Sequence, residues 1–412
     1  MSRYDRLRYI IKMDMLLLLH ACREYVGKYF ILLLASINWN IVRAEIPIIA
    51  FIGVPPNCSD SYRFREFREA GFDVSLYDYA DMPLDQLKTI LNTAWQEKVR
   101  VLVGSNLLYK QSGKFIEAIK NHPALFGYFI MDEPNPDQLH IVSSRYVAIR
   151  KHDKQTMCYM NLHPNLGAEQ EKYFKMGSYT EYLKKASHID LPQISFDIYP
   201  ITTDSVRTTW YPCLEDVRHE SLRSQKPFWA FVLSTPHSYY PKPTISSLRL
   251  QIYSNLAYGA KAIQYFTYWT PDVPGGTFHN GPIDINGKPT DTYQLVKRMN
   301  KELRGIIPLF DGSTVKSVNH MIHVPYNGVK MKRPPLNVRR LKVKGYEGAI
   351  VSVIEKNDKV YMVVVNKDLM NSMQLIVKAN KNVKYISKML QEMPLIGNYT
   401  VPAGDIVMFR LK

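Results

Sequence analysis

The sequence predicts a (β/α)8 barrel followed by an antiparallel β-sandwich. A strand-then-helix rhythm repeats from residue 45, and eight such units fit into roughly 265 residues, as this barrel requires. Helical periodicity stops after about residue 311. An open doubly wound sheet is the alternative, but it usually has fewer units and often a Gly-x-Gly-x-x-Gly loop, which this sequence lacks. We therefore divide the chain into a targeting segment (1–44), a barrel (45–310) and a sandwich (311–412).

The eight predicted barrel strands are short apolar runs that end in turn-forming or polar residues. They are expected at 46–54, 72–79, 99–103, 126–131, 155–162, 194–198, 227–233 and 263–268. Between them, apolar residues recur at helical spacing, which predicts helices around 59–70, 84–97, 114–120, 139–151, 180–186, 214–223, 248–257 and 292–307.

The C-terminal part contains short segments in which β-forming residues prevail, separated by turn signals. These segments cover 348–354, 360–365, 374–377 and 406–411. Short strands with turns between them, and no helical pattern, are typical of an antiparallel sandwich.

The N-terminus is typical of a targeting segment. Lys28 precedes the apolar run 29–37, and Val42-Arg43-Ala44 resembles a small-residue cleavage site. A second apolar run ends at Cys22 and loosely resembles a lipoprotein signal, whereas an uncleaved membrane anchor is a third interpretation. Each of them predicts an exported protein that is periplasmic, secreted or held at the cell surface.

The net charge of +16 is partly concentrated in a basic cluster between Lys330 and Lys344. Such a cluster can bind acidic polymers, but the chain shows no nucleic-acid motif, and a solvated face explains the cluster equally simply. The four cysteines have no metal-like or disulfide-framework spacing, so buried free thiols are expected. We expect no cofactor, no metal and no nucleic-acid partner, and the sequence does not indicate an oligomeric state.

The fourth predicted strand ends in two adjacent carboxylates, Asp132 and Glu133, and then in Pro134-Asn135-Pro136. Side chains at the carboxyl ends of barrel strands meet at one cleft, where enzymes with this barrel fold have their active sites. A carboxylic acid beside an apolar wall has a raised pKa and can donate a proton near neutral pH. Alternatively, the two acids only stabilise the N-terminus of the next helix.

The other strand ends supply further carboxylates and aromatic rings, a combination that suits glycoside hydrolysis. Glu133 is the predicted general acid/base, and Asp132 and Asp197 are candidates for the second catalytic group. The predicted substrate-binding residues are Asn161, His163, Tyr199, His237, Tyr268 and Trp269, with Trp269 as the floor of the sugar site. A structural salt bridge at Asp197, structural histidines and a core tryptophan are the competing interpretations. Neither Gly-x-Ser-x-Gly nor HExxH spacing is present.

Several sequence motifs in residues 45–310 resemble those of clan-A glycoside hydrolases, and in particular those of the family-42 β-galactosidases. They are Glu133 on strand four, Lys226-Pro-Phe-Trp229, Leu256-Ala-Tyr-Gly-Ala260, Gln264-Tyr-Phe-Thr-Tyr-Trp269, Ile283-Asp-Ile-Asn-Gly-Lys-Pro-Thr290, and the spacing of Tyr293, Val296 and Asn300. The resemblance implies a barrel glycosidase, with Glu133 as the acid/base.

Two positions depart from the clan-A pattern. Clan A usually has Asn before the acid/base Glu, where this chain has Asp132, and a nucleophilic Glu at the end of strand seven, where 228–234 contains no acid. Asp197 can supply the second carboxylate, the site can be a degenerate one that only binds sugar, or the substrate can supply its own nucleophile.

The last explanation follows from the order Asp132-Glu133, which resembles substrate-assisted N-acetylhexosaminidases, whose Asp orients the 2-acetamido group. Neighbouring strand residues point to opposite faces, so both acids reach one cleft only if the strand ends there. We thus predict an exported glycoside hydrolase acting on a poly- or oligosaccharide, and the basic surface permits an anionic glycan. A substrate-assisted hydrolase and a non-catalytic glycan-binding barrel are the alternatives.

Overall fold

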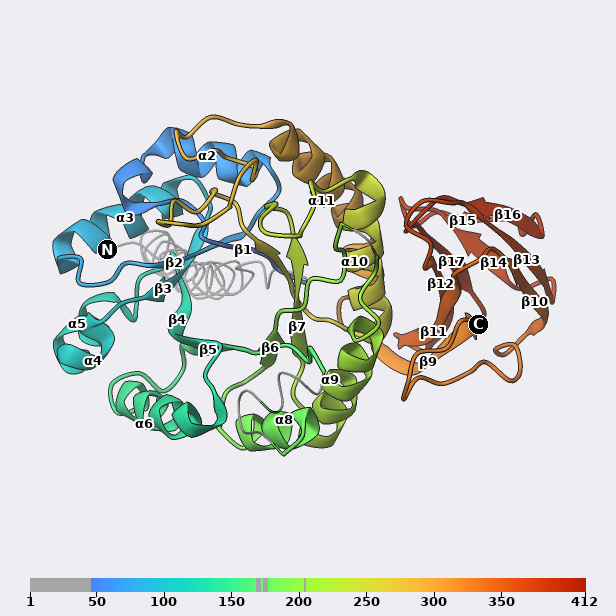
Figure 1. Cartoon of the computed structure of the whole chain (residues 1–412), viewed down its shortest axis with the longest axis horizontal. Helices are drawn as coiled ribbons and strands as arrows, with labels where there is room; N and C mark the ends of the chain where they lie inside the picture. The colour runs from blue at the N-terminus through green and yellow to red at the C-terminus, as the bar shows by residue number, and fades with distance from the viewer. Residues whose placement is uncertain (1–45, 168–171, 173–176, 204) are drawn as a thin grey trace, which may run out of the picture. The chain divides into compact units, whose positions relative to one another are not determined.

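The computed structural model describes residues 46–167, 172, 177–203 and 205–412, so the predicted targeting segment lies outside the described residues. Residues 46–412 form one compact unit. Eight parallel strands close into a barrel in sequence order, and helices surround it (Figure 1). The predicted barrel is thus confirmed.

The barrel strands are shorter than most of the predicted ones, because the flanking residues belong to the loops. They are β1 (Ile48–Phe51), β2 (Val74–Asp78), β3 (Arg100–Gly104), β4 (Leu125–Asp132), β5 (Met157–Leu162), β6 (Ile194–Phe196), β7 (Phe228–Leu233) and β8 (Ile263–Phe266).

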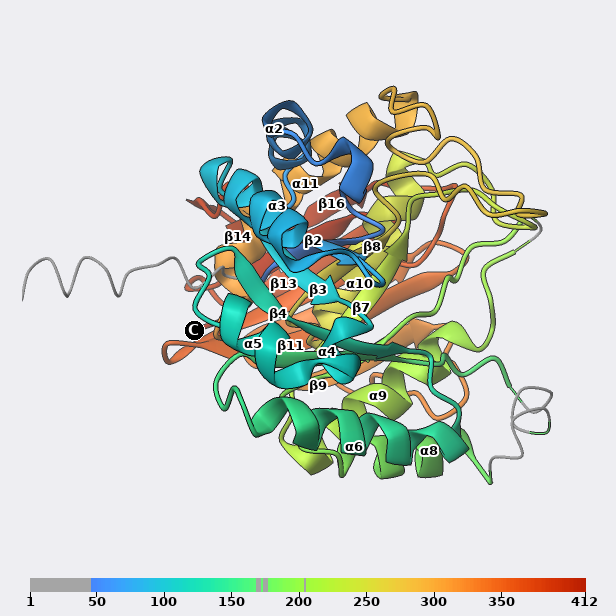
Figure 2. The same ribbon diagram turned by 90° about the vertical axis from the view of Figure 1, so that its left-hand side faces the viewer.

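The described helices are α2 (Ser61–Glu69), α3 (Leu84–Gln96), α4 (Leu107–Lys110), α5 (Ser112–Ile119), α6 (Leu139–Arg150), α8 (Tyr179–Ser187), α9 (Trp210–Ser224), α10 (Ile245–Tyr258) and α11 (Asp291–Phe310), with short 3-10 turns at Pro56–Cys58 and Pro136–Gln138. Figure 2 shows α6 and α8 beside each other along one side of the barrel.

Local sequence signals explain where these helices begin and end. Ser178 and Glu181 form a capping box at the start of α8, and Thr244 and Ser247 form another at the start of α10. Gly259 ends α10 at φ 109°, a left-handed conformation that glycine adopts without strain. Among the described residues, no helix is both long and apolar enough to cross a membrane.

The C-terminal part contains a six-stranded and a three-stranded antiparallel sheet, in agreement with the predicted sandwich. The larger sheet comprises β9 (Thr314–Ile322), β11 (Gly348–Lys356), β12 (Lys359–Asn366), β14 (Lys384–Ile386), β15 (Glu392–Met393) and β17 (Ile406–Arg410). The smaller sheet comprises β10 (Val338–Lys344), β13 (Met373–Ala379) and β16 (Asn398–Val401). The sequence patterns missed β9, β10 and the short strands β14 to β16.

The larger sheet is buried on both faces, which explains the nearly continuous apolar runs in β11 and β12. Ala349 and Val351 pack into the core shared with the smaller sheet, whereas Ile350 and Ile354 pack into the core that includes α10. Ser352 also donates a hydrogen bond of 2.8 Å to the Ala257 carbonyl of α10. The sandwich therefore rests directly on the barrel (Figure 1).

Candidate active site

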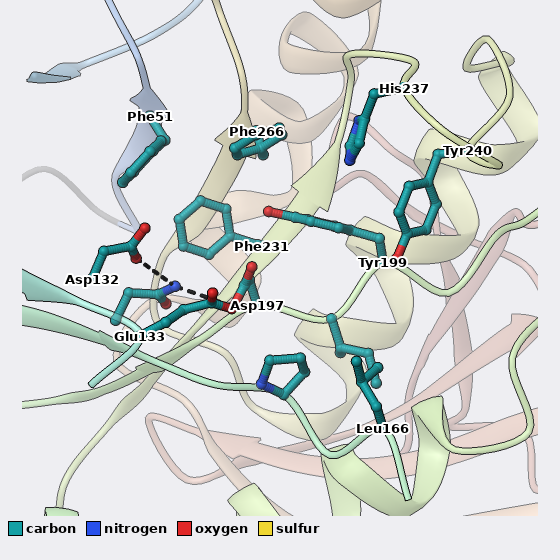
Figure 3. Close-up of a pocket in the computed structure, with 13 residues that line it drawn as sticks. Phe51, Asp132, Glu133, Leu166, Asp197, Tyr199, Phe231, His237, Tyr240 and Phe266 are labelled. Atoms are coloured by element: carbon teal, nitrogen blue, oxygen red, sulfur yellow. Dashed lines mark hydrogen bonds between the residues drawn. The ribbon is translucent and has the colours of Figure 1, made fainter. Parts of the chain in front are cut away.

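The end of β4 brings both adjacent acids to the same cavity. Asp132 is the last residue of the strand, and Glu133 has φ 40°, a left-handed conformation that is uncommon for a residue with a side chain. The Glu133 N–H still donates to the Asn161 carbonyl at 2.9 Å. The left-handed residue interrupts the alternation of the strand, so Asp132 and Glu133 both face the cavity (Figure 3). Such backbone strain is concentrated at functional sites.

The cavity has a volume of about 270 Å³ and lies at the carboxyl ends of the barrel strands. One part of its lining is polar and the other is aromatic or aliphatic (Figure 3). The lining residues are Phe51, Asp132, Glu133, Asn161, Pro164, Leu166, Asp197, Ile198, Tyr199, Phe231, His237, Tyr240 and Phe266. This is the position at which barrel enzymes have their active sites.

Asn161 links two of the carboxyl groups from the end of β5. Its amide nitrogen donates to Asp132 Oδ1 at 3.2 Å and to Asp197 Oδ1 at 3.1 Å. Its amide oxygen accepts a hydrogen bond of 3.1 Å from Ser195. The side chain is therefore held at both ends and fixes the positions of the two acids.

A buried network of hydrogen bonds inside the barrel holds the Asn161 side chain in place. Ser195 Oγ lies 2.9 Å from the Tyr159 hydroxyl and 2.9 Å from Gln264 Nε2, and Tyr159 donates to Gln264 Oε1 at 2.7 Å. Buried groups that satisfy one another in this way rigidify their surroundings. The network thus presents Asn161, and through it Asp132 and Asp197, in one geometry.

Asp197 and Glu133 are neighbouring carboxyl groups whose pKa values move in opposite directions. Burial raises the pKa of Asp197 well above its usual range, and the negative charges of Glu133 and Asp132 and a hydrogen bond with Glu133 raise it further. Burial opposes ionisation of Glu133 as well, but His163 and Asp197 outweigh it and hold the pKa of Glu133 below its usual value. His163 Nδ1 lies 3.5 Å from Glu133 Oε1. The two shifts therefore favour a proton on Asp197 beside a charged Glu133.

Asp132 is the third acid of the site. Burial and the charge of Glu133 raise its pKa to about 6, although Asn161 and His163 act in the opposite direction. Protein surrounds the residue on most sides, yet its carboxylate opens into the cavity, where solvent or substrate reaches it. Asp132 is therefore mostly ionised at neutral pH.

The opposite side of the cavity carries aromatic rings. Phe51 from β1 lies 6.0 Å from Phe231 of β7 and 6.0 Å, in a stacked arrangement, from Phe266 of β8.

After β7, Ser234 donates to the Thr267 carbonyl at 2.8 Å, and Thr235 Oγ1 lies 2.9 Å from Thr267 Oγ1. The end of strand seven thus supplies hydroxyl groups and no carboxylate.

Most of the predicted site residues meet at this cavity. Asp132, Glu133, Asn161, Asp197, Tyr199 and His237 line it, and His163 contacts Glu133. The sequence patterns did not single out Phe51, Phe231, Phe266, Tyr240 or Leu166. Phe231 and Phe266 lie in predicted strands, but an apolar residue at a strand end gives no signal that separates a sugar site from a core.

Two predicted sugar-binding residues lie elsewhere. Tyr268 is fully buried between the barrel and its helices, with Phe67 at 4.8 Å and Phe72 at 5.5 Å from its ring. Trp269 is outside the cavity lining and packs under the Arg63 guanidinium at 5.4 Å. Trp269, predicted as the floor of the sugar site, does not line this cavity because β8 ends at Phe266, and Phe266 is the residue of this segment that lines it.

Among the described residues, no group of three or more His, Cys, Asp or Glu side chains is placed to hold a metal ion. The cavity nevertheless gathers three carboxyl groups, an amide and aromatic rings at the end of a closed parallel barrel. Carboxyl groups opposite aromatic rings suit the hydrolysis of glycosidic bonds.

Comparisons with known proteins show which protein family the chain resembles. The family model for glycoside hydrolase family 42, described as β-galactosidase, matches residues 120–306. No curated protein sequence matches the chain.

Three solved structures share the fold. A catalytic mutant of a family-42 β-galactosidase from G. stearothermophilus has a TM-score of 0.63 at 9% identity, covering 89% of this chain and 98% of that one. A β-galactosidase from Bacillus circulans sp. alkalophilus has a TM-score of 0.60 at 10% identity, covering 89% and 99%. A family-39 glycoside hydrolase from Bacteroides cellulosilyticus WH2 has a TM-score of 0.51 at 14% identity, covering 89% and 81%. The chain is a glycoside hydrolase that resembles the family-42 β-galactosidases.

Proposed function

We propose that the protein hydrolyses O-glycosidic bonds of an oligo- or polysaccharide, with Glu133 as the general acid/base. The observation that carries this proposal is the meeting of Glu133, Asp132 and Asp197 in one cavity opposite an aromatic wall. A catalytic acid needs a proton held near neutral pH and a position at the reacting oxygen. In our proposal, Glu133 takes the proton from Asp197 as the glycosidic bond breaks and delivers it to the leaving oxygen.

Asp132 is the proposed partner of Glu133. Its ionised carboxylate faces the same cavity, where it can stabilise the positive charge that develops at the anomeric carbon. Asn161 bonds to one oxygen of Asp132 and one of Asp197.

The dimensions of the cavity support action at a chain end. About 270 Å³ is close to the lower end of the roughly 300–1,000 Å³ of small-molecule sites. One sugar ring fits such a space, and a chain running through it does not. We therefore propose that a single terminal sugar occupies the cavity.

Substitution of Glu133 by Gln tests the acid/base role. The amide keeps the shape of the side chain but cannot carry the proton, so kcat should fall about 100-fold to 10,000-fold while sugar binding persists. Hydrolysis of aryl β-galactoside, β-glucoside and β-N-acetylglucosaminide should be measured for both proteins. Wild-type rates in the Gln variant would refute the assignment, and sugar binding without hydrolysis by the wild type would favour a glycan-binding barrel.

Substrate assistance is the second candidate mechanism. It is favoured by the left-handed Glu133, which lets Asp132 and Glu133 face one cavity, and by the hydroxyls that replace an acid after β7. In that mechanism Asp132 orients the 2-acetamido group, whose oxygen attacks the anomeric carbon. Cleavage of only the N-acetyl substrate in the same assay would support it, whereas cleavage of plain hexosides would require Asp132 or Asp197 as the second carboxylate.

We also propose export, on the basis of the basic residue, apolar run and small-residue site in the first 44 residues. Fractionation of cells that express the full chain should recover it outside the cytoplasm. Deletion of residues 1–44 should retain it inside.

A further inference from the structure

A second cavity, of about 1,100 Å³, lies where the loops of the barrel meet the C-terminal sheets. It is larger than the cavity that contains Asp132 and Glu133, the catalytic cavity, and no proposed catalytic role involves it. Its barrel side is formed by Asn165, Gly167 and residues 202, 203, 205–209, 211 and 212, and its sheet side by residues 323–326, Glu347 and 367–370.

The two cavities share a wall. Along one short segment, Pro164 and Leu166 line the catalytic cavity, and Asn165 and Gly167 line the larger one. Arg207 lines the larger cavity and donates hydrogen bonds of 3.1 Å to the Tyr199 carbonyl and 3.0 Å to the Tyr240 hydroxyl. Tyr199 and Tyr240 line the catalytic cavity, so Arg207 joins the linings of the two cavities.

The acids of the larger cavity already have partners. Glu347 lies 3.4 Å from His323 Nδ1, and Asp368 accepts hydrogen bonds of 2.9 and 2.8 Å from the N–H groups of Met370 and Asn371 in its own turn. The backbone N–H groups therefore offset part of the negative charge of Asp368 within its own turn.

Neither cation of the cavity, in contrast, forms an ion pair with a carboxylate among the described residues, although the charge of Glu347 acts on Lys367. Arg207 is held by a carbonyl and by the hydroxyls of Tyr239 and Tyr240. Lys367 is 6% exposed, donates to the His323 carbonyl and lies 5.7 Å above the Tyr211 ring. Burial lowers the pKa of Lys367 to about 8, so it is still mostly charged at neutral pH. A buried cation without an anion is costly unless a ligand supplies one.

We propose that the larger cavity binds an acidic residue of the substrate, a uronate or a sulfated sugar, next to the sugar that occupies the catalytic cavity. Arg207 and Lys367 contact its carboxylate or sulfate, and Tyr326, exposed at the rim, offers an aromatic face to a sugar ring. This inference rests on the proposed function, because it names the class of glycan that the catalytic site cleaves.

The test is equilibrium binding to the Glu133→Gln variant, which requires no turnover. The probes are a galacturonate tetrasaccharide, which carries only carboxylates, a heparin tetrasaccharide, which also carries sulfates, and neutral cellotetraose. At least one acidic probe should bind more tightly than cellotetraose. Lys367→Met should weaken that binding about tenfold or more, because a charge-assisted contact is lost, and Lys367→Arg should keep most of it.

Lys359→Met, which removes an exposed lysine outside the cavity, is the matched control and should change nothing. Cooperative thermal unfolding of the Met variant checks that it folds. Equal affinity for acidic and neutral probes, no binding of either acidic probe, or no effect of Lys367→Met would each overturn the inference. Acid-selective binding combined with hydrolysis of no glycan by the wild type would instead contradict the proposed catalysis and leave the binding site intact.

Discussion

The two sides of the catalytic cavity differ in chemistry. The acid wall consists of Asp132, Glu133, Asn161 and Asp197, from the ends of β4, β5 and β6, whereas the aromatic wall consists of Phe51, Phe231 and Phe266, from β1, β7 and β8. A hydrogen-bonded network positions the acid wall, and ring packing positions the aromatic wall. All the ionisable groups for bond cleavage therefore act from one side, and the other side lowers the local polarity and receives a sugar face.

Neutralising Asp132 should produce the largest loss after Glu133→Gln. Asp132→Asn removes the charge that we assign to transition-state stabilisation, so kcat should fall about 100-fold to 1,000-fold. Because the pKa of Asp132 is about 6 and the ionised form is the active one, wild-type activity should also decline as the pH falls below 6. Full activity of Asp132→Asn at pH 7 would show that the acid wall works without this residue.

Asp197→Asn should have a smaller effect on rate and a distinct effect on pH dependence. In the wild type the proton on Asp197 is held up to a raised pKa, and activity is lost as the pH rises through it. The variant has no second carboxyl group to hold this proton, so the alkaline limb of kcat/KM should move to lower pH. We expect an approximately tenfold lower rate at neutral pH. An unchanged alkaline limb would mean that Glu133 does not draw its proton from Asp197.

The acid wall was far more accessible to sequence reasoning than the aromatic wall. Carboxylates that follow the runs 126–131 and 194–196 stand out, since acids are rare at buried strand ends. Phe266, Tyr268 and Trp269 occur within four residues, and only the end of β8 decides which ring faces the cavity. The left-handed conformation of Glu133 and the placement of Arg207 by a loop depend on tertiary contacts, for which the sequence has no periodic signal.

A substitution in the aromatic wall should change affinity and leave the pH profile intact. Phe266→Leu keeps an apolar side chain but removes the flat ring on which a sugar can stack. We expect KM to rise about 3-fold to 10-fold, with kcat and both pH limbs unchanged. A shift of either limb would show that the aromatic wall also tunes the pKa values of the acids opposite.

The smallest effect is expected at Tyr268, which lies between the barrel and its helices and outside the cavity lining. Its hydroxyl is buried and has no hydrogen-bond partner among the described residues. Tyr268→Phe removes that unsatisfied group, so the free energy of unfolding should be unchanged or higher by up to about 1 kcal/mol. Because the ring packs on Phe67 and Phe72 and not into the cavity, kcat and KM should stay within about twofold of the wild type. Steady-state kinetics of Tyr268→Phe measure kcat and KM, and denaturant unfolding measures its free energy of unfolding. A raised KM would place the Tyr268 hydroxyl against the sugar, as the sequence pattern first indicated, and would extend the aromatic wall beyond Phe266.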